Sequence, residues 1–103
     1  MAMQVSWWER RDAADRDALG RAALAHCRAL RTREGMQGAR FYWLGPDTLV
    51  LVEEVESLDI PSEGMAPDQA QTFFALADLA RQTHDERWQD PGSGEAFYRL
   101  ARR

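Results

Sequence analysis

The stretch Gly38 to Ser57, GARFYWLGPDTLVLVEEVES, decides how the rest of the chain folds. Aromatic and β-branched residues fill its two arms, and Gly, Pro and Asp interrupt it at residues 44–48, which predicts two strands joined by a tight loop. Consecutive side chains alternate between the two sides of this hairpin: Phe41 and Trp43 against Tyr42 and Leu44, then Leu49 and Leu51 against Val50 and Val52. A half-solvated strand alternates apolar with polar residues. Because both sides are apolar as far as Glu53, we expect both to be covered.

The length and composition of the chain predict one soluble domain over residues 1–103, which the order of its predicted elements places in the α+β class. The chain is 45% hydrophobic and 29% charged, with a net charge of −4, which is ordinary for a globular protein. All basic residues are Arg, and from Met36 to Gln71 the chain has a marked excess of acidic residues. Nucleic-acid binders normally carry a basic patch or stripe. The acidic balance therefore argues against a nucleic-acid partner.

The single cysteine, Cys27, allows no internal disulfide, so the fold does not depend on an oxidising compartment. No Cys/His cluster has the spacing of a zinc site. The sequence has no charged-then-apolar leader and no run near the ~20 apolar residues that a membrane span needs. We therefore expect no metal site and no membrane partner, and a cytoplasmic location by elimination.

Residues 3–9, MQVSWWE, predict a first strand with Trp7 and Trp8 on opposite faces. Met3 and Val5 share the face of Trp7, whereas Ser6 shares the face of Trp8. Trp is common in cores and at interfaces. One ring is therefore expected in the core and the other at an interface, unless one of them lines a ligand pocket.

The next segment predicts a helix from an N-cap at Asp12 to about Thr32, with Gly35 as its stop signal. Its apolar stripe contains Leu19, Ala23, His26 and Leu30, flanked by Ala22 and Cys27. His26 is either a buried neutral imidazole that is hydrogen-bonded inside the core, or an acid, base or ligand lining a pocket. Cys27 is expected to be a small packing residue.

A loop over Leu58–Ala66 leads to a second predicted helix that starts near Pro67. Its stripe contains Phe73, Leu76, Ala77, Ala80, His84 and Trp88. Both histidines of the chain thus lie on apolar stripes, which suggests a shared polar pocket. Residues 89–94 are rich in turn formers, and residues 95–103 fit a short helix or a last strand, with the helix slightly favoured because Glu, Ala, Leu and Arg are good helix formers.

The order strand, helix, hairpin, helix places both helices on one face of a sheet, with a right-handed crossover if the first strand and a hairpin strand are parallel neighbours. The other face keeps large apolar side chains that a monomer would expose. A second copy of the chain is the simplest cover. We therefore expect a two-fold homodimer with its sheets face to face.

This order of elements, together with the two-sided sheet, resembles the dimeric α+β barrel superfamily, and within it the antibiotic-biosynthesis-monooxygenase-like domains. The resemblance covers nearly the whole chain and implies a ferredoxin-like α+β domain whose sheet pairs with that of a second copy. It also implies a small aromatic ligand held between helices and sheet. Activities in the superfamily include cofactor-independent oxygenation of polyphenols, haem degradation and lactone isomerisation.

The resemblance also suggests site residues. The haem-degrading branch uses an Asn, a Trp and a second-helix His: His84 matches the His, Phe74 stands in place of an aromatic, and the Asn has no counterpart, with Ser6 or Trp7 in its region. We expect no cofactor; haem, bound through His84, is the one exception to consider. The expected acid or base residues are His84 and His26. The expected ligand-binding residues are Trp7, Trp8, Tyr42, Trp43, Phe73 and Trp88.

Two functions remain open at this point. One is a small-ligand pocket in which a histidine takes a proton from a phenol while aromatic walls exclude water. The other is a non-catalytic dimeric binding or scaffold module, with the aromatic rings filling the cavity. The acidic residues Glu53, Glu54 and Glu56 are expected on a solvated strand end rather than in a metal site or against a basic partner.

Overall fold

The computed structural model describes residues 2–56 and 66–89. In chain order its elements are β1 (Ala2–Arg10), α1 (Arg16–Arg31), β2 (Met36–Trp43), β3 (Thr48–Val55), α2 (Pro67–Leu79) and β4 (Ala80–Gln89). This α+β order confirms the predicted strand, helix, hairpin and helix, and adds a fourth strand. The predicted loop over 58–66 lies almost entirely outside the described residues, as do the turn beyond Gln89 and the segment 95–103.

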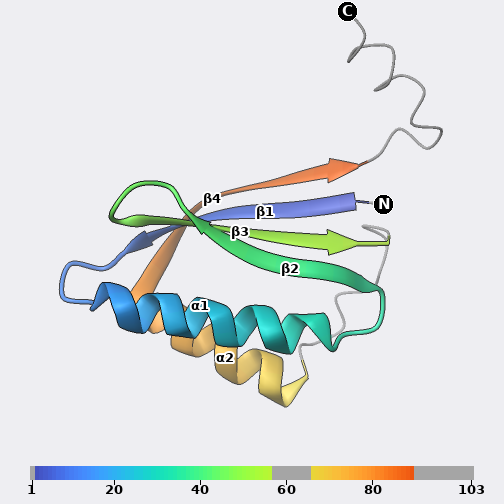
Figure 1. Cartoon of the computed structure of the whole chain (residues 1–103), viewed down its shortest axis with the longest axis horizontal. Helices are drawn as coiled ribbons and strands as arrows, with labels where there is room; N and C mark the ends of the chain where they lie inside the picture. The colour runs from blue at the N-terminus through green and yellow to red at the C-terminus, as the bar shows by residue number, and fades with distance from the viewer. Residues whose placement is uncertain (1, 57–65, 90–103) are drawn as a thin grey trace, which may run out of the picture.

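The four strands form one sheet in the order β2-β3-β1-β4, and every neighbouring pair is antiparallel. The two strands that α1 connects are not neighbours, because β3 lies between them. The condition on which the right-handed crossover depended, a parallel pair of neighbouring strands, is therefore not met. Figure 1 shows α1 and α2 on the same side of the sheet, as predicted, and neither of the described helices lies on the other side.

The hairpin prediction is confirmed. The strands β2 and β3 pair from Trp43 opposite Leu49 to Met36 opposite Val55, with an irregularity near Met36. The Leu44 amide donates to the Thr48 carbonyl at 2.8 Å and closes the loop. Gly45 has φ +83°, in the left-handed region that glycine adopts without strain.

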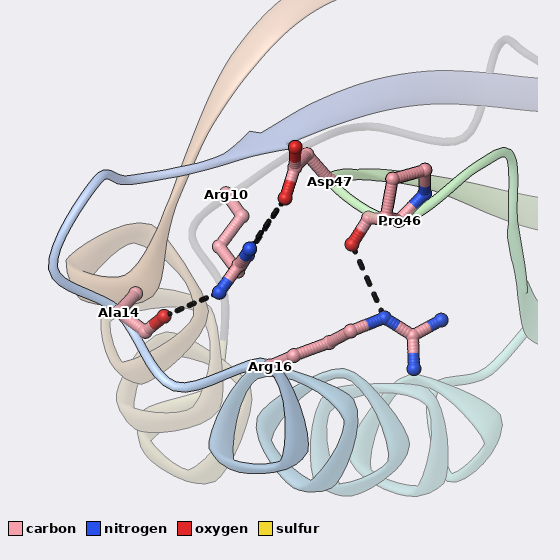
Figure 2. A network of polar contacts seen from close by, with 5 residues as sticks. All are labelled: Arg10, Ala14, Arg16, Pro46 and Asp47. Atoms are coloured by element: carbon pink, nitrogen blue, oxygen red, sulfur yellow. Dashed lines mark hydrogen bonds and ion pairs between the residues drawn. The ribbon is translucent and has the colours of Figure 1, made fainter.

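Arginine side chains attach this loop to the connection between β1 and α1, as Figure 2 shows. The Arg10 guanidinium binds the Asp47 carboxylate and also donates to the Ala14 carbonyl at 2.9 Å. The Arg16 Nε donates to the Pro46 carbonyl at 3.1 Å. The hairpin loop is therefore held against the start of α1.

The first helix begins three residues later than predicted. Asp15, not Asp12, is the N-cap, and its carboxylate accepts from the Ala18 amide at 3.2 Å. Residues 11–14 form a turn closed by a hydrogen bond from the Ala14 amide to the Arg11 carbonyl. The predicted end is confirmed, because Thr32 is the C-cap and Gly35 has φ 84°.

The second helix ends nine residues earlier than predicted. It stops at Leu79, and Ala80 already has extended backbone angles, φ −145° and ψ 156°. Residues 80–89 form β4, which pairs with the whole of β1. The helical stripe that was predicted to continue through His84 to Trp88 was therefore wrong beyond Leu79.

The core fills the space between the helices and the sheet. The largest completely buried side chains in it are Leu19, Leu49, Leu76 and Cys27. Trp8, Ala39 and Leu51 complete the sheet's contribution, with Phe41 and Trp43 partly buried against it. Since directly paired residues share a face, Val5, Trp7, Tyr42, Val50 and Val52 lie on the opposite face, which is called the open face below.

Candidate functional site

The predicted site residues divide between the two faces of the sheet. Trp8, Trp43, Phe73 and His26 lie on the helix side, whereas Trp7, Tyr42, His84 and Trp88 lie on the open face. The pocket shared by both histidines, which the sequence suggested, is not formed within one chain. Each face therefore has to be considered as a site of its own.

On the helix side, three aromatic rings meet around one polar pair. The His26 ring lies 5.8 Å from the Phe73 ring, and Phe73 lies 5.9 Å from Trp8, both in edge-on arrangements. The Trp8 indole donates to the Ser6 hydroxyl at 2.9 Å, so its polar atom is satisfied. His26 is only 3% exposed. Burial lowers the pKa of His26, which keeps the imidazole neutral at pH 7.

Hydrogen bonds around Thr72 determine which nitrogen of His26 carries the proton. His26 Nδ1 lies 2.9 Å from the Thr72 hydroxyl oxygen. That hydroxyl donates its only hydrogen to the Gln69 carbonyl at 3.0 Å, so it can only accept from the imidazole. On this network we assign the proton of the neutral imidazole to Nδ1. Its Nε2 keeps a lone pair and has no hydrogen-bond partner among the residues described.

Two further ionisable groups lie on the helix side, near the C-terminal half of α1. Burial raises the pKa of the Cys27 thiol to about 11, with Arg31 opposing and Glu53 reinforcing the shift. The thiol is therefore protonated and acts as a packing residue, as predicted. Burial also raises the pKa of Glu53, against the influence of Arg33. This carboxyl group accepts a proton more readily than an ordinary glutamate does.

The open face carries a second set of aromatic residues. Trp7 and His84 are paired across β1 and β4 with their rings 5.0 Å apart. His84 Nε2 lies 3.3 Å from the Glu86 carboxylate, which also accepts from the Trp88 indole at 3.3 Å. A bulge beside Trp7 inserts Thr83, whose hydroxyl donates to the Trp7 carbonyl. Bulges of this kind re-aim neighbouring side chains.

His84 does not match the second-helix histidine of the haem-degrading proteins. It lies on a strand, its side chain is 60% exposed, and it contacts Glu86 rather than a pocket between helix and sheet. Phe74, which the resemblance placed beside it, is 63% exposed on α2. These residues do not fit a haem group held as the resemblance implied.

Three polar residues of the helix side were not predicted there. Thr72 and Gln69 were not singled out from the sequence, and Glu53 was assigned to a different environment. Thr72 and Gln69 lie one and four positions before Phe73, on the inward face of α2, so extending the stripe towards Pro67 would have found them. Glu53 was expected on a solvated strand end but is partly buried opposite Ala39. Glu54 is paired with Arg40, and Glu56 is exposed as expected.

The hollows lined by described residues include two that do not contact His26. One of about 320 Å³ is lined by Glu9, Arg10, Arg11, Asp12 and Arg81. The other, of about 270 Å³, lies between Trp43 and the N-terminal half of α1. Within residues 2–56 and 66–89, no group of three or more His, Cys, Asp or Glu side chains could hold a metal ion. In the same ranges, no helix is long and apolar enough to cross a membrane.

Comparison with known proteins gives relatives by structure only. No family model and no curated protein sequence matches the chain. Rv0793 from Mycobacterium tuberculosis matches with a TM-score of 0.67 and 22% identity, covering 85% of this chain and 92% of that one. A proposed antibiotic biosynthesis monooxygenase from Deinococcus radiodurans matches with a TM-score of 0.64 and 14% identity, covering 86% and 91%.

A third solved structure adds a description of the fold. It is a dimeric protein of unknown function and ferredoxin-like fold from Bacteroides fragilis, with a TM-score of 0.63 and 12% identity over 85% of this chain and 94% of that one. At these identities the likeness concerns the fold. The chain therefore has the ferredoxin-like α+β fold of these monooxygenase-like structures, and the resemblance predicted from the sequence is confirmed at that level.

Proposed function

We propose that the chain is a homodimeric small-ligand-binding protein with monooxygenase-like chemistry on a phenolic or aromatic molecule, and that His26 is its base. The observation that carries the proposal is the buried pair of His26 and Thr72. This pair fixes a neutral imidazole with a free Nε2 lone pair beside the rings of Phe73 and Trp8. A base in apolar surroundings is suited to take a proton from a weakly acidic phenol.

The chemistry follows from that arrangement. Nε2 takes the substrate proton, and Nδ1–H donates to Thr72, which stabilises the imidazolium that forms. The deprotonated substrate is electron-rich and is the only reductant: it gives four electrons to dioxygen and becomes a quinone, which takes one oxygen atom as its new carbonyl while the other oxygen leaves as water with the two hydrogens lost by the substrate. The edge-on contacts of Phe73 keep bulk water from the anion. Glu53, with its raised pKa, is a second proton carrier on the same side.

Dimerisation belongs to the same proposal. Val5 and Val52 on the open face are only 2% and 8% exposed, but Tyr42 and Trp88 around them are 53% and 49% exposed. The ion pair of Arg40 with Glu54 stands at the edge of this patch. An exposed aromatic patch with a polar rim is typical of a protein interface. The dimeric ferredoxin-like neighbour supports a second copy as its partner.

The test compares the only two histidines of the chain. Oxygen uptake and product formation are measured with a panel of polyphenols and anthrones for the wild type, His26→Gln and His84→Gln. Our assignment predicts loss of turnover in His26→Gln with an unchanged circular dichroism spectrum, and retained turnover in His84→Gln. Loss confined to His84→Gln would place the chemistry on the open face and refute the assignment to His26.

A specific observation favours the second candidate, a non-catalytic dimeric module. The core on the same side as His26 contains completely buried side chains, among them Leu19, Leu76 and Cys27, and neither the hollow beside Arg81 nor the one beside Trp43 contacts the imidazole. If the chain is such a non-catalytic module, no phenol should quench the fluorescence of Trp8, and His26→Gln should change only the free energy of unfolding. Titration of the wild type and a Trp8→Phe variant with phenols separates the two functions.

A further inference from the structure

A groove separate from the His26 pair lies between the N-terminal half of α1 and the end of β2. It has a volume of about 270 Å³ and is lined by Arg16, Asp17, Gly20, Arg21, Leu24 and Trp43. All of these except Trp43 belong to α1, and none of them is among the buried residues of that helix. The volume is just below that of typical small-molecule sites, about 300–1,000 Å³. The groove therefore suits a small ligand.

Arg16 is fixed in a single orientation at the edge of this groove. Its guanidinium carbon lies 3.8 Å from the Trp43 ring centroid, and its Nε donates to the Pro46 carbonyl. Pro46 is itself held by the hairpin loop that Arg10 and Asp47 attach to the start of α1 (Figure 2). The guanidinium is thus positioned before any ligand binds, which reduces the loss of side-chain entropy on binding.

The remaining donors of Arg16 are unused. Figure 2 shows its two terminal nitrogens directed away from Pro46, and neither has a partner among the described residues. The guanidinium of Arg21, on the same lining, likewise has none there. With Asp17 as the one acid in the lining, the groove has a net charge of +1. A planar fork of two N–H groups is the arrangement that binds a carboxylate in two places at once.

The groove also has an apolar side. Leu24 is 38% exposed, and the Trp43 ring forms the wall beside Gly20. A Cβ atom built on Gly20 would stand 3.7 Å from the Trp43 ring, an ordinary van der Waals contact, so only a longer side chain at this position would fill the groove. A ligand that fits has one negative charge at one end and an apolar body at the other.

We propose that this groove is a binding site for a small organic carboxylate, with its charge on Arg16 and Arg21 and its body against Trp43 and Leu24. The hollow beside Arg10, Arg11 and Arg81 is a weaker candidate. Arg10 and Arg81 there are already paired with Asp47 and Glu9, and Arg11 donates to the Ala77 carbonyl.

The test uses benzoate as the probe and benzamide as its uncharged match, at constant chloride, with ¹H–¹⁵N NMR spectra of the wild-type protein. We expect benzoate to shift the amide signals of Gly20 and Leu24 with saturation near ~1 mM or below. Arg16→Gln should weaken binding by about tenfold or more, because a charge-assisted pair of hydrogen bonds is lost. Gly20→Met should abolish binding by filling the groove.

Two variants serve as matched controls. Gly20→Ala adds only the Cβ atom that the groove accommodates, and Arg28→Gln removes an exposed charge from α1 outside the groove. Both should bind benzoate within about twofold of the wild type. Equal shifts with benzamide, equal weakening by Arg28→Gln, or no saturable shift with benzoate would each overturn the proposal.

Discussion

Replacing Thr72 with Val removes the hydroxyl that orients His26 while keeping nearly the same shape. In the wild type this oxygen accepts from His26 Nδ1–H at 2.9 Å and donates to the Gln69 carbonyl at 3.0 Å. Val leaves an N–H group of a 3% exposed imidazole without a partner. Leaving a buried donor unpaired costs about 1–3 kcal/mol. We expect Thr72→Val to lower the free energy of unfolding by an amount in that range.

The measurement is urea denaturation followed by circular dichroism, with Thr72→Ser as the control that keeps the hydroxyl. The serine variant loses one partly buried methyl group, which is worth about 0.8 kcal/mol or less. A double-mutant cycle with His26→Phe isolates the pair, because the valine should cost much less when no imidazole is present. Long-range ¹H–¹⁵N NMR should show the Nδ1-protonated form of His26 in the wild type.

Two results would refute this reasoning. If Thr72→Val is as stable as the wild type and the double-mutant cycle shows no coupling between residues 72 and 26, the hydrogen bond does not contribute to the free energy of unfolding. If the wild-type imidazole carries its proton on Nε2, the lone pair that the proposed base needs faces Thr72 instead. Either outcome removes the main support for His26 as a base.

Three more perturbations test the fold and the assembly. Burial lowers the pKa of His26 below 6.5, so as the pH falls the unfolded chain takes up a proton before the folded chain does, and the free energy of unfolding should decrease below about pH 6.5. In urea titrations at several pH values, His26→Phe should show a smaller decrease than the wild type over this range. Val50→Arg on the open face should convert the dimer to a monomer in sedimentation velocity, whereas a wild type that is already monomeric at high concentration would contradict the proposed dimer. Leu76→Ala should lower the free energy of unfolding by about 2–5 kcal/mol in chemical denaturation, because Leu76 is completely buried; a loss below 1 kcal/mol would mean that the core around it is loosely packed.

The hairpin was predictable because its signals are local. Glycine and proline mark the loop at residues 44–48, and strict alternation assigned Leu49 and Leu51 to one face and Val50 to the other. The start of α1 was less predictable, since Asp12 and Asp15 are equally good capping residues by type. The choice of Asp15 depends on the turn at residues 11–14, where the Arg11 amide donates to the carbonyl of Leu79, far away in sequence.

The candidate site was predictable only on the helix side. His26 lies on a stripe of period 3.6 that continues along α1, so its burial followed from the sequence. Its partner Thr72 was overlooked because a polar residue on an inward face is not part of an apolar pattern. The burial of Glu53 depends on how far the helices extend over the sheet, which no local pattern records.

The misassigned β4 shows why one spacing can support two structures. His84 and Trp88 are four residues apart, and that interval returns to the same face in a helix of period 3.6 and in a strand of period 2. Glu86 distinguishes the two structures: a helix places it away from them, whereas the strand places its carboxylate between the His84 imidazole and the Trp88 indole. Neither glycine nor proline marks the change at Ala80, so the pairing with β1, rather than local preference, determines the strand. That pairing places His84 across the sheet from His26, and it is the reason why one chain has a buried histidine on one side of its sheet and exposed aromatic residues on the other.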